Sequence, residues 1–256
     1  MAAGDRGISR VAEVLKTRLD QILVQRGLAA TREKAQALIL SGQVFVNDQK
    51  ADKAGRTVAD DAAIRVAESL PYVGRGGLKL AAALDAFHID LTGCVCLDIG
   101  ASTGGFTDCM LQRGAARVYA VDVGAGQLDW KLRNDPRVVV RDKVNARYLA
   151  AADIGQQVAF ISMDVSFISA TMILPQLPAL LAAESRGVVV LVKPQFEVGR
   201  GQVGKGGVVR DPALHEQSVE KVAAAGEALG FRRVGVIPSP ITGASGNREF
   251  LLFLKK

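Results

Sequence analysis

Cysteine, histidine and aromatic residues are scarce in this chain of 256 residues. It has 3 Cys and 2 His, and aromatic residues make up 5% of the sequence. Three cysteines cannot build a disulfide framework, and the few His and Cys residues lack metal-ligand spacing. The sequence therefore predicts no bound metal and favours the reducing cytoplasm. With 49% hydrophobic and 23% charged residues, the composition excludes a collagenous or largely disordered chain.

Long hydrophobic runs are also missing. Charged residues interrupt every apolar stretch among the first thirty residues, so we expect no signal peptide. The most apolar segment, residues 170–183, contains Pro175 and Pro178 and is shorter than the roughly 20 residues of a membrane helix. We therefore expect no membrane partner. The length leaves room for one large domain or for two smaller ones.

The formal net charge of +6 is concentrated near the start of the chain. Residues 16–66 predict a small α+β unit, with helices over 17–26 and 32–41 capped by Thr17 and Thr31, and strands over 44–46 and 63–66. Positions 16 to 56 hold four acidic residues and eight basic ones. The basic residues are Lys16, Arg18, Arg26, Arg32, Lys34, Lys50, Lys53 and Arg56. This excess favours a polyanionic partner.

Strands and helices alternate after a joint at residues 67–77 that contains proline and glycine. The predicted strands are 95–99, 118–122, 138–140, 159–163, 188–192, 233–237 and 250–254. The predicted helices are 78–87, 105–112, 127–133, 168–181 and 212–229. This alternation predicts an α/β fold with a parallel, doubly wound sheet.

The first strand of this sheet runs into a glycine-rich loop, residues 98–106. Glycine lets the backbone approach a ligand closely, and Asp122, at the end of the next strand, can accept hydrogen bonds from ribose hydroxyls. The G-x-G-x-x-G fingerprint is absent, and Asp98 would repel a pyrophosphate but tolerate an amine and a sulfonium. The loop therefore favours S-adenosylmethionine over a nicotinamide cofactor, and a turn without a ligand is the remaining alternative.

A second glycine-rich stretch, residues 199–206, follows the spacing of a phosphate-binding loop up to its last position. There Gly206 replaces the required hydroxyl residue, and no helix is expected before residue 212. Nucleotide hydrolysis is therefore disfavoured. We expect a mobile loop that places Arg200, Lys205 and Arg210 beside the crevice, where it closes over a nucleic-acid substrate.

Four charged residues stand at the ends of predicted elements: Lys79, Asp164, Lys193 and Glu249. If the sheet is doubly wound, Asp164 and Lys193 end neighbouring strands on the ligand side. A lysine whose charged form is disfavoured by burial can take the proton of a ribose 2′-hydroxyl while carboxylates orient the amines, and in-line methyl transfer then depends on positioning. For any single residue, a surface salt bridge is the alternative.

Three phenylalanines border the expected crevice: Phe106, Phe167 and Phe196. An aromatic ring there can stack on a base or on the adenine of a cofactor. Packing in the core explains each of them equally well, so both interpretations stay open.

Five segments carry a family resemblance: residues 18–24 (RLDQILV), 75–80 (RGGLKL), 96–108 (CLDIGASTGGFTD), 163–169 (MDVSFIS) and 191–197 (LVKPQFE). The chain resembles the TlyA (hemolysin A) family of ribosomal RNA methyltransferases from about residue 16 to 254. The resemblance implies an N-terminal tail (1–15), an RNA-binding domain like ribosomal protein S4 (16–66), a linker (67–77) and an FtsJ-like methyltransferase domain (78–256). That domain would have a Rossmann-like class I sheet of seven strands, the last one antiparallel.

The same resemblance assigns functional residues. It places a catalytic tetrad on Lys79, Asp164, Lys193 and Glu249. It places the cofactor site on Gly100, Ala101, Ser102, Thr103, Gly104, Gly105, Phe106 and Asp122. Asp98 is added to this site because of its position at the start of the glycine-rich loop. The candidate RNA-binding residues are Lys16, Arg18, Arg26, Arg32, Lys34, Arg75, Arg200 and Lys205.

The activity that the resemblance implies is 2′-O-methylation of cytidine in ribosomal RNA, with S-adenosylmethionine as cofactor. The partner would be 16S or 23S RNA, or both, within ribosomal subunits. A non-catalytic RNA-binding or ribosome assembly factor is an alternative, and so is a membrane-active hemolysin. The oligomeric state is not predicted.

Overall fold

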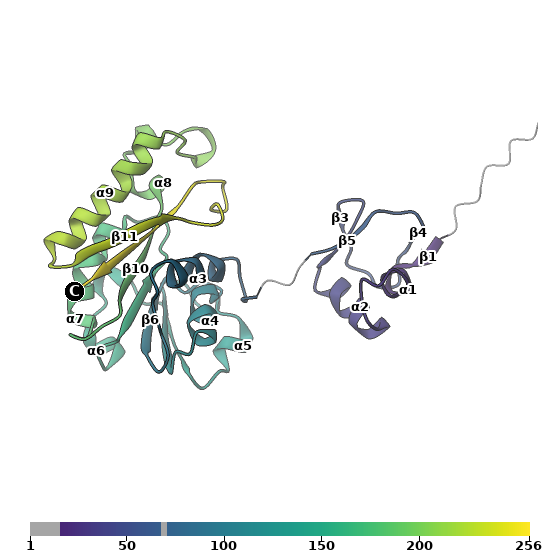
Figure 1. Ribbon diagram of the computed structural model, residues 1–256, viewed down its shortest axis with the longest axis horizontal. Coiled ribbons are helices and arrows are strands. Elements are labelled where there is room, and N and C mark those ends of the chain that lie inside the picture. Colours follow the sequence, from purple (N-terminus) through teal and green to yellow (C-terminus); the bar gives the residue numbers. More distant parts are fainter. Residues whose placement is uncertain (1–15, 68–70) are drawn as a thin grey trace, which may run out of the picture. The chain divides into compact units, whose positions relative to one another are not determined.

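The chain forms two compact units, which are described separately. The computed structural model describes residues 16–67 and 71–256, and the units comprise residues 1–69 and 70–256 (Figure 1). The predicted tail, residues 1–15, and residues 68–70 of the predicted linker lie outside the described residues. The side chain of Arg200 lies outside them as well.

The small unit is an α+β structure with two short antiparallel sheets. Its elements are β1 (Lys16–Arg18), α1 (Leu19–Gln25), α2 (Arg32–Leu40), β2 (Val44–Val46), β3 (Gln49–Lys50), β4 (Thr57–Ala59) and β5 (Ile64–Val66). Strand β1 pairs with β4, and β2 pairs with both β3 and β5. Apolar side chains of α1, α2 and β2 form the core, in which Leu19, Leu23 and Ile39 are fully buried.

One of the two predicted helix starts in this unit is confirmed, and the other is wrong. The Thr31 hydroxyl accepts a hydrogen bond from the Lys34 amide at 3.2 Å and so caps α2. Thr17 lies in β1 opposite Val58, and α1 begins at Leu19 without a side-chain cap. Pairing with β4 holds the backbone extended at Thr17, and this non-local contact moves the start of the helix.

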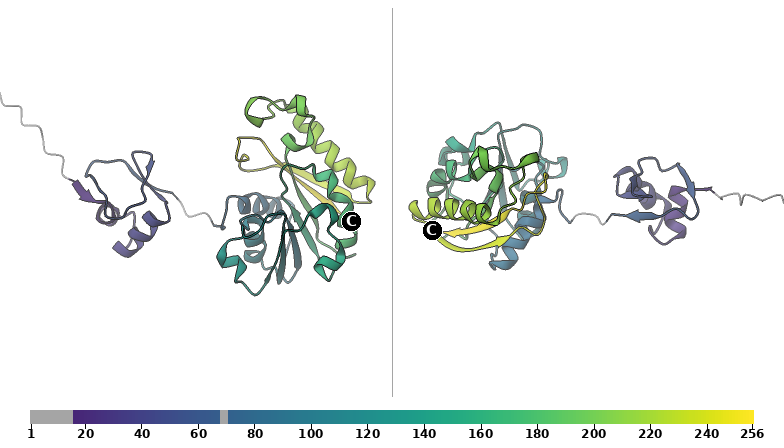
Figure 2. Two further views of the ribbon diagram at one scale, coloured as in Figure 1. Left: turned by 180° about the vertical axis from the view of Figure 1, so that it is seen from behind. Right: turned by 90° about the horizontal axis from the view of Figure 1, so that it is seen from above.

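The large unit is a seven-stranded α/β sheet with helices on both faces (Figures 1 and 2). The strands are β6 (Val95–Ile99), β7 (Arg117–Asp122), β8 (Val138–Asp142), β9 (Phe160–Met163), β10 (Gly187–Val192), β11 (Arg232–Pro238) and β12 (Phe250–Lys255). Their order is β11-β12-β10-β9-β6-β7-β8. Strand β12 runs antiparallel to both of its neighbours, and the strands from β10 to β8 are parallel. The expected sheet, with its last strand antiparallel, is confirmed.

Helices and short 3-10 turns connect these strands. The α-helices are α3 (Gly76–Ala86), α4 (Gly105–Gln112), α5 (Trp130–Arg133), α6 (Ala151–Ile154), α7 (Leu177–Leu180), α8 (Pro194–Glu197) and α9 (Pro212–Ala228). The 3-10 turns are η1 (Ala146–Tyr148), η2 (Ala170–Met172), η3 (Leu174–Gln176), η4 (Arg200–Gln202) and η5 (Lys205–Gly207). Helix α9 is capped as its sequence predicts, because Asp211 accepts a hydrogen bond from the Ala213 amide at 2.9 Å.

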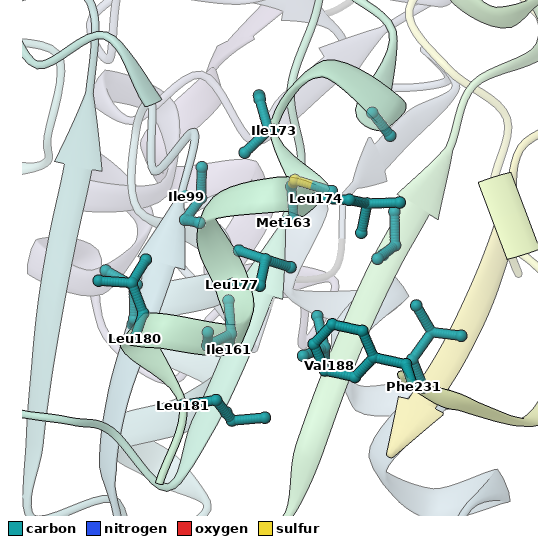
Figure 3. Packing of buried hydrophobic residues seen from close by; sticks show 14 of the residues in the cluster. Ile99, Ile161, Met163, Ile173, Leu174, Leu177, Leu180, Leu181, Val188 and Phe231 are labelled. Atoms are coloured by element: carbon teal, nitrogen blue, oxygen red, sulfur yellow. The ribbon is translucent and has the colours of Figure 1, made fainter. Parts of the chain in front are cut away.

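Successive residues of the central strands pack into two separate cores, one on each face of the sheet. Leu97 and Ile99 belong to a core with α7 and α9, whereas Cys96 belongs to a core with α3 and α4. Figure 3 shows the first core, in which Ile161 and Leu177 pack together. Because helices cover both faces, most residues of the central parallel strands are apolar, and a ligand approaches at the strand ends.

The helix expected over residues 168–181 is not continuous. The structure has η2, η3 and α7 in its place. Pro175 and Pro178 lie in the first turns of η3 and α7, because proline has no amide hydrogen for a continuing helix. Across the described residues, no helix is both long enough and apolar enough to cross a membrane.

A buried carboxylate, that of Asp20, organises polar side chains of the small unit. Asp20 is fully buried and accepts hydrogen bonds from Arg18 Nη2 at 3.0 Å, Arg32 Nε at 2.9 Å and Gln36 Nε2 at 2.9 Å. The hydrogen bonds from Arg18 hold the pKa of Asp20 well below its usual range, and burial opposes them. One acid therefore fixes two of the arginines that we expect to bind RNA.

Replacing Asp20 with alanine should destabilise the small unit by about 2 kcal/mol, because three donors lose their shared acceptor. Hydrogen exchange of the α1 and α2 amides in the full chain would measure this change separately from the large unit. Asp52→Ala, at an exposed acid of the same unit, is the matched control and should leave the exchange rates unchanged.

The same interaction makes the small unit sensitive to acid. Folding lowers the pKa of Asp20, so its stabilisation is complete above the ordinary aspartate pKa of about 4 and is lost as the pH falls further. Protection of the α1 and α2 amides should therefore fall more steeply in acid in the wild-type chain than in Asp20→Asn. Equal slopes would contradict the assignment of this stabilisation to Asp20.

Candidate active site

The carboxyl ends of the parallel strands open onto two adjoining cavities in the large unit. The first, of about 560 Å³, is lined by Lys79 and Lys193 and is called the lysine cavity. The second, of about 550 Å³, is lined by Asp122 and is called the Asp122 cavity. Five residues line both of them: Gly100, Ser102, Asp164, Ser166 and Phe167. The two cavities therefore meet where β6 and β9 end.

The glycine-rich loop after β6 approaches neighbouring groups closely. Gly100 has a φ of +84°, and a Cβ there would lie 2.2 Å from the carbonyl oxygen of Asp164. Gly104 has a φ of +99°, and a Cβ there would lie 2.2 Å from the Leu132 side chain. Both positions require glycine for conformation and for space. The loop residues that line the lysine cavity are Gly100, Ala101, Ser102, Thr103, Gly105 and Phe106, and Gly104 lines neither of the two cavities.

Asp98 does not face the cavities, although its position at a strand end led us to expect this. Its carboxylate is fully buried and accepts hydrogen bonds from Thr107 Oγ1 at 2.6 Å and from Ser162 Oγ at 3.0 Å. Burial raises its pKa to about 7. The alternation of side chains along β6 directs Asp98 to the face that α4 covers. The interpretation of Asp98 as a direct cofactor ligand is therefore corrected: it joins β6 to α4 and β9.

Asp122 lies at the end of β7, where its carboxylate forms part of a cavity wall. It accepts hydrogen bonds from the Ser102 amide at 2.8 Å and from the Gly124 amide at 2.7 Å. These two bonds fix the carboxylate and leave further lone pairs for the hydroxyls of a ligand.

Sequence reasoning missed the rest of the wall around Asp122. That wall includes Val123, Gln127, Val144, Asn145 and Ala146. A signal for residues 144–146 was present, because they follow β8, whose carboxyl end lies at the same edge of the sheet.

Two lysine–carboxylate pairs line the lysine cavity. Lys79 Nζ lies 2.6 Å from Glu249 Oε2, and both side chains are almost fully buried. Lys193 Nζ lies 2.5 Å from Asp164 Oδ1 and donates a hydrogen bond to the Ser166 hydroxyl at 2.9 Å. Asp164 Oδ1 makes no aligned hydrogen bond among the described residues, so its interaction with Lys193 is one of charge. The structure thus brings all four predicted tetrad residues to one cavity.

The strand order explains how Glu249 reaches this cavity. Asp164 and Lys193 directly follow β9 and β10, which are parallel neighbours. Strand β12 is antiparallel, and its first residue, Phe250, pairs with Val192 at the end of β10. Glu249 therefore stands at the edge where the parallel strands end.

The residues that directly follow the second glycine-rich stretch are attached to the segment before β12 by Asn247. This buried side chain accepts a hydrogen bond from the Val209 amide at 2.9 Å and donates one to the Gly207 carbonyl at 2.8 Å. Val203 and Gly207 line the lysine cavity. The stretch is therefore part of the cavity wall, and its mobility stays a prediction.

The basic residues of the small unit lie in different surroundings. Lys16 and Lys34 are exposed. Arg26 Nη1 donates a hydrogen bond to the Ala62 carbonyl at 2.7 Å, and a second bond from Arg26 reaches the carbonyl of Asp60. The two lysines are thus available to a polyanion, whereas Arg26 also closes a loop of its own unit.

The rim of the lysine cavity combines aromatic and cationic groups. Phe167 is 92% exposed, and its ring lies 5.3 Å from that of Phe196. Both rings and the exposed Arg75 line this cavity, whereas Lys205 is exposed outside both cavities. Phe106 is buried in the core with α3 and α4. Phe106 thus packs in the core and also borders the lysine cavity, while the exposed ring of Phe167 is accessible to a ligand.

Strand order and site together define the class of this protein. The sheet has seven strands, of which β12 is antiparallel to its neighbours. A glycine-rich loop follows β6, and Asp122 ends β7. Together these features define an α/β methyltransferase fold. The chain belongs to the FtsJ-like methyltransferase family, which it matches over residues 72–256. It also carries an S4 domain, matched over residues 17–64.

Individual relatives agree with this assignment. The chain is 50% identical over 242 residues to the 16S/23S rRNA (cytidine-2′-O)-methyltransferase TlyA of Mycobacterium tuberculosis, covering 94% of this chain and 90% of that protein. It is 43% identical to hemolysin A of Brachyspira hyodysenteriae, over 91% of this chain and 98% of that protein. A solved structure from Streptococcus thermophilus, described as a candidate hemolysin, is 46% identical, with a TM-score of 0.72 and coverage of 95% and 90%. The resemblance to the TlyA (hemolysin A) family is confirmed.

Gly100→Ala should destabilise the large unit more than Gly126→Ala does, although both residues have positive φ. Alanine at Gly126 has open space and should cost about 1 kcal/mol for its backbone conformation alone. Alanine at Gly100 also meets the Asp164 carbonyl and should cost about 3 kcal/mol or more. Denaturant unfolding followed by circular dichroism would measure both values, and equal losses would contradict a close contact at Gly100.

Proposed function

We propose that this protein transfers a methyl group from S-adenosylmethionine to the ribose 2′-hydroxyl of a cytidine in ribosomal RNA. The observation that carries this proposal is that two lysine–carboxylate pairs, one buried and one half-buried, line one cavity that adjoins the Asp122 cavity. The S4 domain supports RNA as the partner, and the name of the M. tuberculosis relative supports cytidine in 16S and 23S RNA. The RNA would be bound within ribosomal subunits.

The Asp122 cavity fits the adenosine part of S-adenosylmethionine. The carboxylate of Asp122 would accept hydrogen bonds from the ribose hydroxyls, and the apolar side chains of Val123 and Ala146 would cover the adenine. Gly100 lines both cavities, so the glycine-rich loop is placed to hold the amino-acid part between them. The bound cofactor supplies an electrophilic methyl group on a sulfonium.

The lysine cavity supplies the groups that activate the hydroxyl. Asp164 and Glu249 each orient one lysine amine. In this proposal Lys193 takes the hydroxyl proton, and Lys79 stabilises the negative charge that develops on the oxygen. A bound S-adenosylmethionine would supply the methyl group for in-line transfer to this oxygen, and the role of the cavity residues is to position the hydroxyl and to accept its proton.

A non-catalytic RNA-binding or assembly factor would not need this cavity. Buried ionic groups lose their hydration, and a scaffold protein gains nothing from that cost. The name hemolysin A of one relative keeps a membrane-active role as a further candidate. Methyl transfer is therefore the property that a direct test must address.

Mass-spectrometric mapping of ribose methylation tests the proposed function directly. Small and large ribosomal subunits that lack the modification are incubated separately with the protein and S-adenosylmethionine. We expect a 2′-O-methyl group on a defined cytidine in one subunit or in both. No added methyl group in either subunit would overturn the proposed function.

Lys193→Ala should reduce this methylation by about 100-fold or more, because the group that takes the proton is lost. The dissociation constant of S-adenosylmethionine should change by less than about threefold, since Lys193 lies outside the Asp122 cavity. Lys131→Ala, at an exposed lysine of α5, serves as the control and should retain full activity. Undiminished activity of Lys193→Ala would remove Lys193 from the mechanism.

Lys16→Ala and Lys34→Ala should each weaken RNA binding and reduce its salt slope by about one, because each exposed lysine would neutralise one phosphate. Their affinity for S-adenosylmethionine should stay at the wild-type value. Filter binding of ribosomal RNA at several salt concentrations measures the slope. Unchanged slopes would contradict a role for these lysines in docking.

A further inference from the structure

Helix α8 ends in a buried acid that belongs to neither cavity. Glu197 is 6% exposed, and its Oε2 accepts a hydrogen bond from Ser169 Oγ at 2.6 Å. Its Oε1 accepts one from the Ala170 amide at 2.7 Å. Lys221 Nζ, on α9, lies 3.2 Å from Oε2 and donates a hydrogen bond to the Glu197 carbonyl at 2.7 Å. A buried carboxylate with this many partners fixes the elements that carry them.

The elements that Glu197 joins are the two segments that carry the Lys193–Asp164 pair. Ser169 and Ala170 belong to the segment that leaves β9 through Asp164 and enters η2. Glu197 closes the short segment that leaves β10 through Lys193. The two segments are therefore joined by the Lys193–Asp164 pair, which lines the lysine cavity, and by the hydrogen bonds of Glu197, which lines neither cavity.

The remaining contacts between these segments lie at the cavity itself. They are the hydrogen bond from Lys193 to Ser166 and the contact of the Phe167 and Phe196 rings. Phe167 is exposed, and both contacts join side chains only, so neither acts on the backbone directly. Glu197 is the buried, hydrogen-bonded link, and its bond to the Ala170 amide acts on the backbone directly.

We propose that Glu197 is a positioning residue for methyl transfer: its carboxylate fixes the Asp164 segment against the Lys193 segment and thereby sets the geometry of the Lys193–Asp164 pair. This inference rests on the proposed function, because it gives Glu197 a purpose in that reaction. Glu197 lines neither cavity and touches no reacting atom, so it acts through the pair. Without it, β9 and β10 stay paired, but the segments beyond them separate.

Three variants separate positioning from stability. Glu197→Ala removes the link. Glu197→Gln keeps the shape, since its oxygen can accept from the Ala170 amide while its amide group donates to Ser169 Oγ. Lys221→Met removes the ion pair and the hydrogen bond to the Glu197 carbonyl but leaves the bonds of Glu197 to Ser169 and Ala170 in place. It is the matched control for lost stability.

Methylation kinetics on a competent ribosomal subunit, well below each melting temperature, should separate the variants. We expect Glu197→Ala to lower kcat by about 10- to 100-fold, because small misplacements of reacting groups have effects of that size. The KM values for RNA and cofactor should stay within about twofold, as expected for an effect on the chemical step alone. Glu197→Gln should recover most of kcat. Lys221→Met should melt at a lower temperature but keep the wild-type kcat.

Several results would overturn the proposal. Wild-type turnover by Glu197→Ala would do so, and so would a loss that appears only in KM. A Glu197→Gln variant no better than alanine would show that charge, rather than the link, matters. If the wild-type chain itself transfers no methyl group, the proposed function fails, and hydrogen exchange then tests the link alone. The Ala170 amide should lose protection in Glu197→Ala and keep it in Lys221→Met, and equal protection would refute the link.

Discussion

The close contact between Gly100 and the backbone of Asp164 is the constraint on which both cavities depend. A Cβ at position 100 would lie 2.2 Å from the Asp164 carbonyl oxygen, so only glycine lets the loop after β6 turn against the end of β9. Because of this turn, the same few residues line the two cavities, and Asp164 is among them. A larger side chain would separate the strand ends and, with them, the Asp122 cavity from the lysine cavity. The arrangement of the two cavities therefore depends on a glycine at position 100.

Strand order decides which charges then meet at that edge. Lys79 and Glu249 are 170 positions apart in the sequence, and they meet because β12 runs antiparallel and begins where β10 ends. Burying such pairs costs hydration, and well-placed partners must offset that loss. The two hydrophobic cores on either side of the sheet supply the rigid frame that holds the partners in place. The register that pairs β9, β10 and β12 in the core therefore also brings Asp164, Lys193 and Glu249 together at the edge of the sheet.

Features that local rules determine could be predicted from the sequence, whereas features that depend on a distant partner were missed. Asp164 and Lys193 could be found because each directly follows an apolar run that is typical of a buried strand. Asp98 stands within β6, where alternation fixes the face to which its side chain points, but the Thr107 and Ser162 hydroxyls that bind its carboxylate come from α4 and β9, and no local pattern shows them. Thr17 is a residue type that often caps helices, but it pairs with β4, a strand too short to predict.

The break in the helix expected over residues 168–181 could have been predicted, because Pro175 alone argues against one continuous helix. The apolar periodicity of the segment outweighed this signal. The roles of the site residues remain predictions.

The segment that leads into the large unit is, in part, fixed to the helix after the glycine-rich loop. The Val73 amide donates a hydrogen bond to Asp108 on α4 at 2.9 Å. At the start of α3, the backbone of Gly77 lies so close to Gly105 that a Cβ on Gly105 would stand 2.9 Å from the Gly77 amide nitrogen. Helix α3 then carries Lys79 into the lysine cavity. A displacement of this segment would therefore act on the glycine-rich loop and on the Lys79–Glu249 pair together. Residues 71–77 are for this reason better understood as part of the catalytic unit than as a free spacer.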